Sequence, residues 1–364
     1  MDTPVPTDTD KSVSDFGHDS QWSFDALADE RFSDNPDINP ALVALYETYV
    51  ISARDKRLAD QLDRLLDGAL LTQSVSPGKR FEGRALFVTG ESGAGKSRSL
   101  AYLFSKRPML APKETPLGTM MPLVSVVAPS PCTLRQLAQS ILETVGYVAG
   151  KDLKENVAWR IVKHQLRERR VLILHIDELQ HALQSVAPQE HQKVLNTLKN
   201  IMQDDTWPMR LILSGLPDLK RMARKDPQIP FRSRFFSCDK LSIPHDVKFV
   251  RFLLKAILET RLGFDIKHIQ SDEFYLRLCH AAENLTGRIV RITQGAAEEV
   301  IYSGRKVVEE ADFAAAYALI SGCDRDENVF LVRKWDQIDP SNGLDSDDPE
   351  IADDSRPRRK RRRK

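Results

Sequence analysis

Short apolar runs alternate with longer amphipathic stretches between residues 84 and 243. Five of these runs are expected to form strands, at residues 86–88, 123–127, 171–176, 211–213 and 236–243. Most are apolar at nearly every position, which is typical of strands buried on both faces of a parallel sheet. Between them, apolar residues recur at helical spacing over residues 97–104, 133–145, 153–168 and 189–202. Strands that alternate with helices predict an α/β fold with a parallel five-stranded sheet over residues 81–243.

The pattern changes after residue 243. Helical spacing continues over residues 247–261, 272–282, 287–301 and 311–320, without a further strand-like run. We therefore predict a smaller helical lid domain over residues 244–325, which is within the usual size of a domain. Upstream of the sheet, helical spacing over residues 40–46 and 59–71 predicts an N-terminal helical arm, residues 36–80. Residues 74–84 are predicted to form a polar Gly/Pro connector.

Both ends of the chain are polar. Residues 1–35 are rich in Asp, Ser, Thr and Pro and poor in aliphatic residues, so we predict a disordered tail. Residues 326–364 are predicted to form a second disordered tail, in which an acidic stretch precedes the basic run 356–364. Such a basic run can bind DNA, dock a protein partner or mimic a nuclear-localisation signal.

Charge and cysteine content narrow the class of protein. The formal net charge is +1, so any affinity for nucleic acid must come from local patches. No apolar run reaches the ~18 residues that span a bilayer, and the first residues do not resemble a secretory signal. The four cysteines contain no C-x-x-C pair, so we expect reduced structural thiols in a cytoplasmic protein.

Residues 90–97, Gly-Glu-Ser-Gly-Ala-Gly-Lys-Ser, match the phosphate-binding P-loop pattern G-x-x-x-x-G-K-[ST]. An apolar run enters the loop and a helix-compatible run leaves it, which is the context that the motif requires. Lys96 is expected to reach the β- and γ-phosphates and to assist catalysis, and the Ser97 hydroxyl to bind Mg²⁺. The alternative is a Gly/Ser surface turn. The predicted nucleotide contacts are Gly90, Glu91, Ser92, Gly93, Ala94, Gly95, Lys96, Ser97 and Arg98.

The third predicted strand ends in Asp177-Glu178. Nucleotide sites of open α/β sheets lie at the carboxyl ends of strands, and a P-loop precedes this strand. We expect Asp177 to hold Mg²⁺ through water, and Glu178 to orient or deprotonate the attacking water. The alternative is a solvated acidic pair at the start of a loop. His175, His181 and His191 lie nearby without metal-binding spacing, and we assign them no metal role.

Five further positions are candidates for contact with the nucleotide. Ser214 follows the fourth strand and can touch the γ-phosphate or the attacking water, or can simply start a turn. Arg232 and Arg234 lie between aromatic residues and can stabilise transition-state charge on a neighbour's nucleotide, or form surface ion pairs. Arg291, with Arg288, opens a helix of the lid domain and can reach back to the nucleotide, or remain exposed.

Together these features resemble the AAA+ ATPases over residues 84–320. The resemblance assigns Walker A to residues 90–97, Walker B to residues 172–178 and sensor 1 to Ser214. It assigns the arginine finger to Arg232 or Arg234 and sensor 2 to Arg291.

Within AAA+, the chain resembles the transposition ATPases of the TniB/TnsC type. The resemblance rests on the P-loop and on four further segments, residues 176–180, 213–217, 232–235 and 286–291, although Val290 stands where relatives often have Pro. It implies ATP and Mg²⁺ as cofactors, and homo-oligomers, either filaments or rings, on duplex DNA. It also implies recruitment of a transposase, pairing with a target-selection protein, and disassembly driven by hydrolysis. The candidate DNA contacts are Lys106, Arg107, Lys113 and Arg135, which can equally be solvated charges.

A second class of function stays open. A nucleotide-dependent protein adaptor, or a module that resembles a helicase loader, needs the same ATP site but acts on a protein partner. The basic run 356–364 is what such an adaptor can use to dock an acidic partner.

Overall fold

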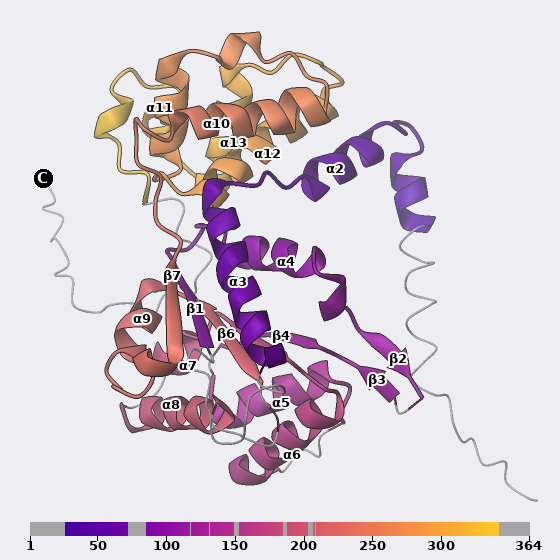
Figure 1. Cartoon of the computed structure of the whole chain (residues 1–364). Helices are drawn as coiled ribbons and strands as arrows, with labels where there is room; N and C mark the ends of the chain where they lie inside the picture. The colour runs from indigo at the N-terminus through magenta and orange to yellow at the C-terminus, as the bar shows by residue number, and fades with distance from the viewer. Residues whose placement is uncertain are drawn as a thin grey trace, which may run out of the picture.

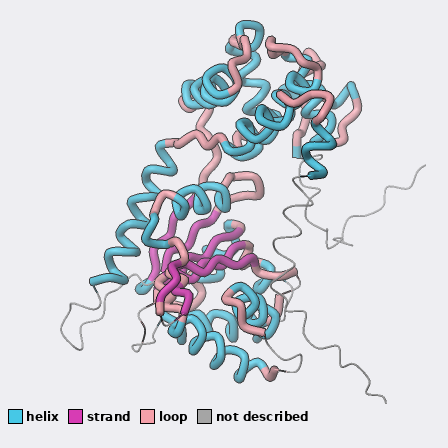
Figure 2. The backbone as a smooth tube through the Cα atoms, turned by 90° about the vertical axis from the view of Figure 1, so that its right-hand side faces the viewer, coloured by secondary structure: helices cyan, strands magenta, loops and turns pink. Residues whose placement is uncertain are grey.

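A computed structural model describes residues 26–71, 85–116, 118–130, 132–148, 153–184, 188–202, 207 and 209–341 of the chain. The predicted connector 74–84, the first 25 residues and the charged run 345–364 lie outside this part. An α/β part carries a largely helical part above it, and the N-terminal helices run between the two (Figures 1 and 2). None of the helices in the described part is long and apolar enough to span a membrane.

The five-stranded sheet is parallel throughout, with strand order β4-β5-β6-β1-β7. The three central strands, β1, β5 and β6, are buried at every position, because helices cover both faces. The α/β fold predicted from the apolar runs is therefore confirmed. The strands are β1 (Ala85–Thr89), β4 (Leu123–Val127), β5 (Ile173–Asp177), β6 (Arg210–Gly215) and β7 (Ser233–Ser237).

The edge strand β7 begins three residues earlier than predicted and ends six residues earlier. It pairs with the whole of β1, from Ala85 opposite Ser233 to Thr89 opposite Ser237. Where β1 ends and the P-loop begins, β7 loses its partner, so residues 239–243 leave the sheet. A short antiparallel hairpin that the sequence did not predict, β2 (Lys113–Thr115) with β3 (Gly118–Met120), precedes β4.

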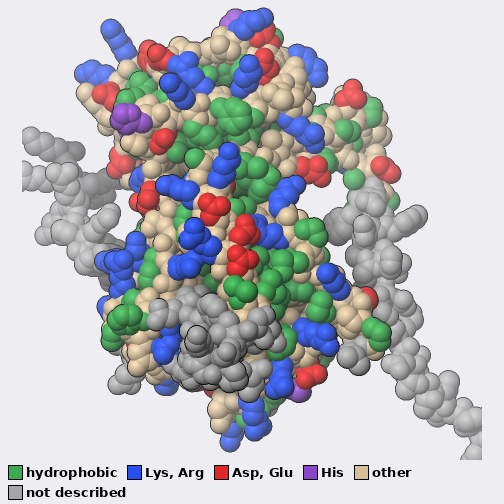
Figure 3. All heavy atoms as spheres, viewed as in Figure 1, with side chains coloured by type: hydrophobic (Ala, Val, Ile, Leu, Met, Phe, Trp, Pro, Cys, Tyr) green, Lys and Arg blue, Asp and Glu red, His purple; other side chains and the backbone are tan. Residues whose placement is uncertain are grey.

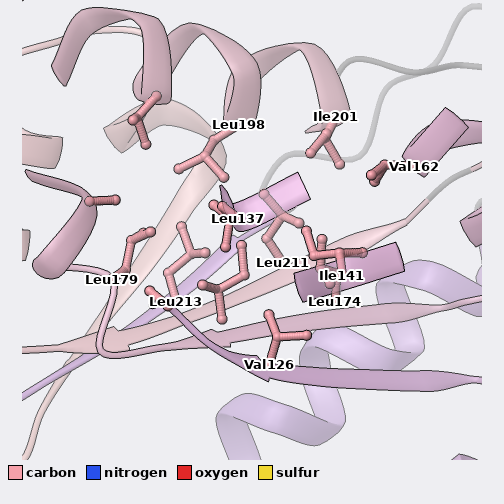
Figure 4. Packing of buried hydrophobic residues seen from close by; sticks show 14 of the residues in the cluster. Val126, Leu137, Ile141, Val162, Leu174, Leu179, Leu198, Ile201, Leu211 and Leu213 are labelled. Carbon is pink, nitrogen blue, oxygen red and sulfur yellow. The ribbon is translucent and has the colours of Figure 1, made fainter. Parts of the chain in front are cut away.

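One face of the sheet is covered by α5 (Leu134–Thr144), α6 (Glu155–Glu168) and α8 (Pro188–Met202). Figure 4 shows leucines and isoleucines of these helices above Leu174, Leu211 and Leu213 of the strands. Burial of each such side chain contributes about 1.5–3 kcal/mol, which holds the strands in register. Two shorter helices, α7 (His181–Gln184) and α9 (Pro217–Ala223), follow β5 and β6.

The opposite face is covered by α3 (Ala53–Leu71) and α4 (Lys96–Ser105), which bury Leu58, Leu62 and Leu100 against the sheet. The second half of the predicted N-terminal arm is thus part of the α/β core. The first half, α2 (Ile38–Glu47), packs on the helical part instead, where Leu45 is fully buried. The segment 48–52 therefore crosses from one part to the other.

The helical part contains α10 (Val247–Leu254), which continues as a π-helix (Lys255–Arg261), then α11 (Asp272–Ala281), α12 (Thr286–Tyr302) and α13 (Glu310–Ser321). Its core is largely aliphatic and includes packed aromatic rings, such as Phe274 against Phe313 at a centroid distance of 4.8 Å. We call this part the lid.

The described parts of both predicted disordered tails, residues 26–35 and 326–341, contain ordered structure. Residues 326–341 pack on the lid: Val329 and Phe330 are buried, and Arg277 donates to the carbonyls of Val329 and Val332 at 3.1 and 2.9 Å. The apolar run 329–332 is short and stands alone in a polar stretch, so it shows no helical pattern. At the other end, residues 26–32 are helical, and they consist largely of strong helix formers.

Candidate nucleotide-binding site

The P-loop leaves the carboxyl end of β1 and ends in the first turn of α4. Gly93 and Gly95 have φ angles of 78° and 87°, in the left-handed region that glycine adopts without a steric penalty. Gly95 is the N-cap of α4. The backbone N–H groups of the loop and the positive end of the α4 dipole therefore lie together, as an anion site requires.

The Lys96 side chain is 5% exposed, and hydrogen bonds to the P-loop hold its ammonium group in place. Its Nζ donates to the carbonyl oxygens of Gly90 at 3.0 Å and Glu91 at 3.1 Å. The ammonium group is thus fixed beneath the loop. This position suits the predicted contact with phosphate oxygens, which stays a prediction.

The carboxylate of Asp177 meets hydroxyl groups from two other elements. Its Oδ1 accepts hydrogen bonds from the Ser214 hydroxyl at 2.5 Å and from the Glu178 N–H at 3.0 Å. The Ser97 hydroxyl forms a further hydrogen bond with the Asp177 carboxylate. Burial raises the pKa of Asp177, but the bonds from Ser214 and Ser97 and the nearby His175 outweigh burial, and the pKa lies below its usual value. An ionised carboxylate beside a serine hydroxyl is the hard oxygen donor set that suits Mg²⁺. The residues predicted to bind the metal are thus brought together.

Glu178 has a φ of 52°, which is uncommon for a residue with a side chain. Its carboxylate accepts a hydrogen bond from the Gln180 amide. Gln180 is 2% exposed, and its Oε1 accepts from the Leu216 N–H at 3.1 Å, in the turn after β6. Gln180 therefore ties the predicted catalytic base to the strand that carries Ser214. No sequence pattern predicted this role for Gln180.

The first turn of α12 lies against the P-loop. A Cβ on Gly287 would lie 2.5 Å from the Gly93 carbonyl oxygen, and a Cβ on Gly93 would lie 2.6 Å from Cγ of Arg288. Arg288 is 8% exposed and pairs with Glu283. Of the two arginines singled out in this helix, Arg288 contacts the loop, whereas Arg291 is exposed on α12.

Ion pairs also connect the P-loop to the lid. Lys240 Nζ lies 2.8 Å from a Glu91 carboxylate oxygen and 3.7 Å from one of Glu283. The hydrogen bond to Glu91 raises the pKa of Lys240. Since Glu283 also pairs with Arg288, one set of charges spans the loop, the segment after β7 and the start of α12. These ion pairs can therefore form together only when the P-loop and the lid lie close to each other.

A pocket of about 200 Å³ opens between the P-loop helix and the lid. Its walls include Tyr49 and Val50 from the crossing segment and Ile257 from the lid. The Tyr49 ring stacks on Tyr102 at 4.0 Å, and its hydroxyl donates to Ser99 at 3.0 Å. Ser99 in turn donates to the buried Asp55 at 2.8 Å. These residues come from three distant parts of the chain, so the sequence did not identify the pocket.

Arg54 lines the same pocket, and sequence reasoning also missed it. Its Nη2 would lie 3.5 Å from a Cβ on Gly95, and its Nε is buried without a hydrogen-bond partner among the described residues. A guanidinium donor without a partner beside a phosphate-binding loop is a ready contact for an anion. No motif covers this position, because it precedes the P-loop by about 40 residues in a helix start of ordinary composition.

Arg232 and Arg234 lie at the other end of the sheet from the P-loop of their own chain. Arg232 ends a 3₁₀ turn (Pro230–Arg232), and Arg234 is exposed on β7 opposite Leu86, near the start of β1. The five residues of β1 separate this end from the P-loop by roughly 15 Å at the rise of a strand. Arg234 donates to Gln61 of α3 at 3.4 Å.

The candidate DNA contacts are partly engaged within the protein. Arg107 pairs with Asp63 at 2.6 Å and donates to the Leu103 carbonyl at 2.7 Å. The Lys106 ammonium lies over the Tyr102 ring at 5.2 Å. Figure 3 shows Lys and Arg interspersed with Asp and Glu over α3. The face in this view therefore carries mixed charges.

The described part of the chain holds no cluster of three or more His, Cys, Asp or Glu side chains that could bind a metal ion.

The strand order, the P-loop after β1, the acidic pair after β5 and the helical lid define the fold as that of the AAA+ P-loop proteins. Residues 79–223 match the model of a family described as "AAA domain". A comparison with curated protein sequences gives no match.

Solved structures show the same fold at low sequence identity. The chain is similar to Cdc6p from Pyrobaculum aerophilum, with 16% identity, a TM-score of 0.55, and coverage of 79% of this chain and 76% of that one. It is also similar to the Aeropyrum pernix ORC1 protein in complex with DNA, with 19% identity, a TM-score of 0.53, and coverage of 80% and 72%. The ADP form of the Aeropyrum pernix ORC2 protein gives 16% identity, a TM-score of 0.51, and coverage of 79% and 75%. The narrower resemblance to TniB/TnsC proteins stays a hypothesis.

Proposed function

We propose that this chain is a Mg²⁺-dependent ATPase whose nucleotide state controls its assembly. The observation that carries the proposal is the meeting of Ser97, Asp177 and Ser214 beside the P-loop, with the lid in contact with the loop through Gly287. A lid that touches the nucleotide loop can change its position when the nucleotide changes.

Each side chain of the site has a task in this proposal. Lys96 and the loop N–H groups bind the β- and γ-phosphates, while Ser97 and Asp177 hold Mg²⁺, which would neutralise phosphate charge when bound. Glu178 accepts the proton of the attacking water, and Ser214 orients that water. Arg288 contributes a lid charge at the loop.

The pocket beside Gly95 is the proposed place for the base of the nucleotide. Val50, Leu253 and Ile257 provide apolar walls, and the pocket opens directly onto the first turn of α4. A flat aromatic base fits between such walls while the phosphates remain on the loop. Since the walls come from both the lid and the crossing segment, a bound base would tie the two parts together.

Arg232 and Arg234 act on a neighbouring copy in this proposal. Both lie roughly a strand length from the loop of their own chain, at the amino-terminal end of the sheet. Hydrolysis would then require a homo-oligomer in which one copy supplies an arginine to the next.

The finer proposal is a regulator of DNA transposition. With ATP, copies of the chain assemble on duplex DNA and recruit a transposase, with a target-selection protein as a further partner, and hydrolysis releases the assembly. The motif resemblance supports this role, and the similar Aeropyrum pernix ORC1 was solved with DNA. The alternative is a nucleotide-dependent adaptor for a protein partner, which the pairing of Arg107 with Asp63 favours, because it occupies a predicted DNA contact.

Particle size in solution separates these two functions. The full chain is measured by light scattering with Mg²⁺ and ATP, with and without duplex DNA, at low and moderate salt. The transposition regulator predicts large particles only when ATP and DNA are both present, and fewer at moderate salt, because phosphate contacts weaken with salt. Particles that stay small and ignore DNA at low salt would favour the adaptor. The Lys96→Ala variant, which should not hold ATP, is the matched control.

A further inference from the structure

A row of polar side chains crosses three strands beneath the proposed metal site. The Ser125 hydroxyl on β4 lies 2.8 Å from Nδ1 of His175 on β5. Nε2 of His175 lies 2.8 Å from the Ser214 hydroxyl on β6, and Ser214 donates to Asp177 at 2.5 Å. Ser125 and His175 are directly opposite each other in the sheet. The row therefore leads from the edge strand to the carboxylate proposed to hold Mg²⁺.

The direction of the hydrogen bonds follows from the groups at the end of the row. An ionised carboxylate only accepts, so the single proton of Ser214 points to Asp177. The Ser214 oxygen must then accept, and the proton between the two residues belongs to Nε2 of His175. The ring is 4% exposed, and the Ser125 hydroxyl is the hydrogen-bond partner of Nδ1. Because that hydroxyl carries its own proton, it can donate to Nδ1 while Nε2 donates to Ser214.

His175 occupies a place where an apolar residue would otherwise be expected. Its strand neighbours Leu174 and Ile176 are fully buried, and its ring meets Phe104 of α4 edge-on at a centroid distance of 5.4 Å. A polar ring in such surroundings costs stability unless both nitrogens are satisfied, which the two serines achieve. The ring is thus locked in one orientation by packing and by two hydrogen bonds.

We propose that His175 is a positioning residue for the metal site: its Nε2–H fixes the Ser214 hydroxyl, which in turn fixes the Asp177 carboxylate that faces Ser97. The inference deepens the proposed ATPase function and rests on it. Groups that orient a metal ligand through a hydrogen bond typically change metal affinity about 10–100-fold when they are removed. A histidine that only fills the core would change stability but not the Mg²⁺ requirement.

Two amide variants separate these roles. His175→Gln carries an amide near the position of Nε2 and can still donate to Ser214, whereas His175→Asn carries its amide near Nδ1 and cannot reach that far. We expect His175→Asn to raise the Mg²⁺ concentration for half-maximal ATP hydrolysis about tenfold or more. His175→Gln should stay close to wild type, and ATP binding measured in EDTA should be unchanged in both.

The control is Thr293→Val in the lid, because Thr293 is fully buried and its hydroxyl donates within its own helix, to the Ile289 carbonyl at 2.7 Å. It should lower the unfolding temperature and leave the Mg²⁺ requirement unchanged. The proposal is overturned if the Asn and Gln variants of His175 shift that requirement equally, or if neither shifts it.

A spectroscopic measurement tests the row without relying on hydrolysis. In ¹⁵N-histidine-labelled protein, the His175 signal is the one lost in His175→Gln, and it should report a ring protonated at Nε2. A ring protonated at Nδ1 would overturn the proposal. If the wild type binds Mg²⁺ and ATP but hydrolyses nothing, the ATPase proposal fails. The variants are then compared by the Mg²⁺ concentration that half-saturates nucleotide binding, and the same two outcomes decide the role of His175.

Discussion

Replacement of Gly287 by Ala should disturb the nucleotide site from the lid side. The new Cβ would lie 2.5 Å from the Gly93 carbonyl oxygen and 3.1 Å from the Gly95 nitrogen, and both are backbone atoms of the P-loop. Ordinary contact begins at 3.4 Å, so the loop and α12 must separate by about 0.9 Å, the difference between 3.4 and 2.5 Å. Neither partner can avoid this by turning a side chain.

We expect a large loss of ATP turnover and affinity, because the P-loop has to keep its shape to bind phosphates. A misplacement of ~1 Å at a reacting centre can lower turnover about 100-fold. We expect Gly287→Ala to lower ATP turnover on that order, and to weaken ATP affinity about tenfold, which corresponds to about 1.4 kcal/mol. The unfolding temperature should fall little, because alanine favours the helix by up to ~1 kcal/mol relative to glycine.

Gly295→Ala is the matched control in the same helix. Its Cβ would meet the Ala316 Cβ at 3.0 Å, inside the lid and away from the loop. It shares the gain in helix propensity but should leave ATP affinity and turnover near wild type. The assay is phosphate release with saturating Mg²⁺, together with ATP titration by fluorescence and a thermal melt. Wild-type turnover and affinity in Gly287→Ala would refute the argument that the lid sits on the loop.

Three further changes test the site. Lys96→Ala removes the ammonium beneath the loop and should abolish measurable ATP binding in a direct titration; normal affinity would show that Lys96 does not contact phosphate. Glu178→Gln keeps the shape but loses the base, so it should bind ATP, hydrolyse it at least about 100-fold more slowly, and form longer-lived particles on DNA by light scattering. Rapid turnover by that variant would end the assignment. Arg232→Ala combined with Arg234→Ala should retain ATP binding and lose hydrolysis, and mixing with Lys96→Ala subunits, which keep both arginines, should restore turnover. Absence of any restoration would argue against an arginine acting on the neighbouring copy.

Much of the fold was predictable because its signals are local. The apolar run at 171–176 is long enough to show burial on both faces, and the P-loop glycines form a motif with one known geometry. The bounds of the edge strand β7 were harder to predict, because they depend on where its partner β1 ends rather than on the residues of β7. The stretch 326–341 was misjudged for a similar reason, since Val329 and Phe330 are buried by distant lid helices.

Part of the candidate site was predictable in the same way, and part was not. Asp177 and Ser214 lie at the carboxyl ends of β5 and β6, and Ser97 lies in the helix after the P-loop, so their meeting at one end of the sheet follows from the topology. The pocket around Tyr49, and the contact between Arg288 and Gly93, depend instead on how the lid packs on the α/β part. No spacing along the chain encodes that packing, which arises from apolar contacts between segments more than 150 residues apart.

Mg²⁺-dependent phosphate release from ATP, measured against protein concentration with and without duplex DNA, tests the central claim most directly. We predict hydrolysis that requires Mg²⁺ and is lost in Lys96→Ala, with a rate per chain that rises with concentration because a neighbour completes the site. DNA should shift that rise to lower concentrations. If the purified chain binds ATP but releases no phosphate at any concentration, with or without DNA, the claim that it is an ATPase working between its own copies is contradicted.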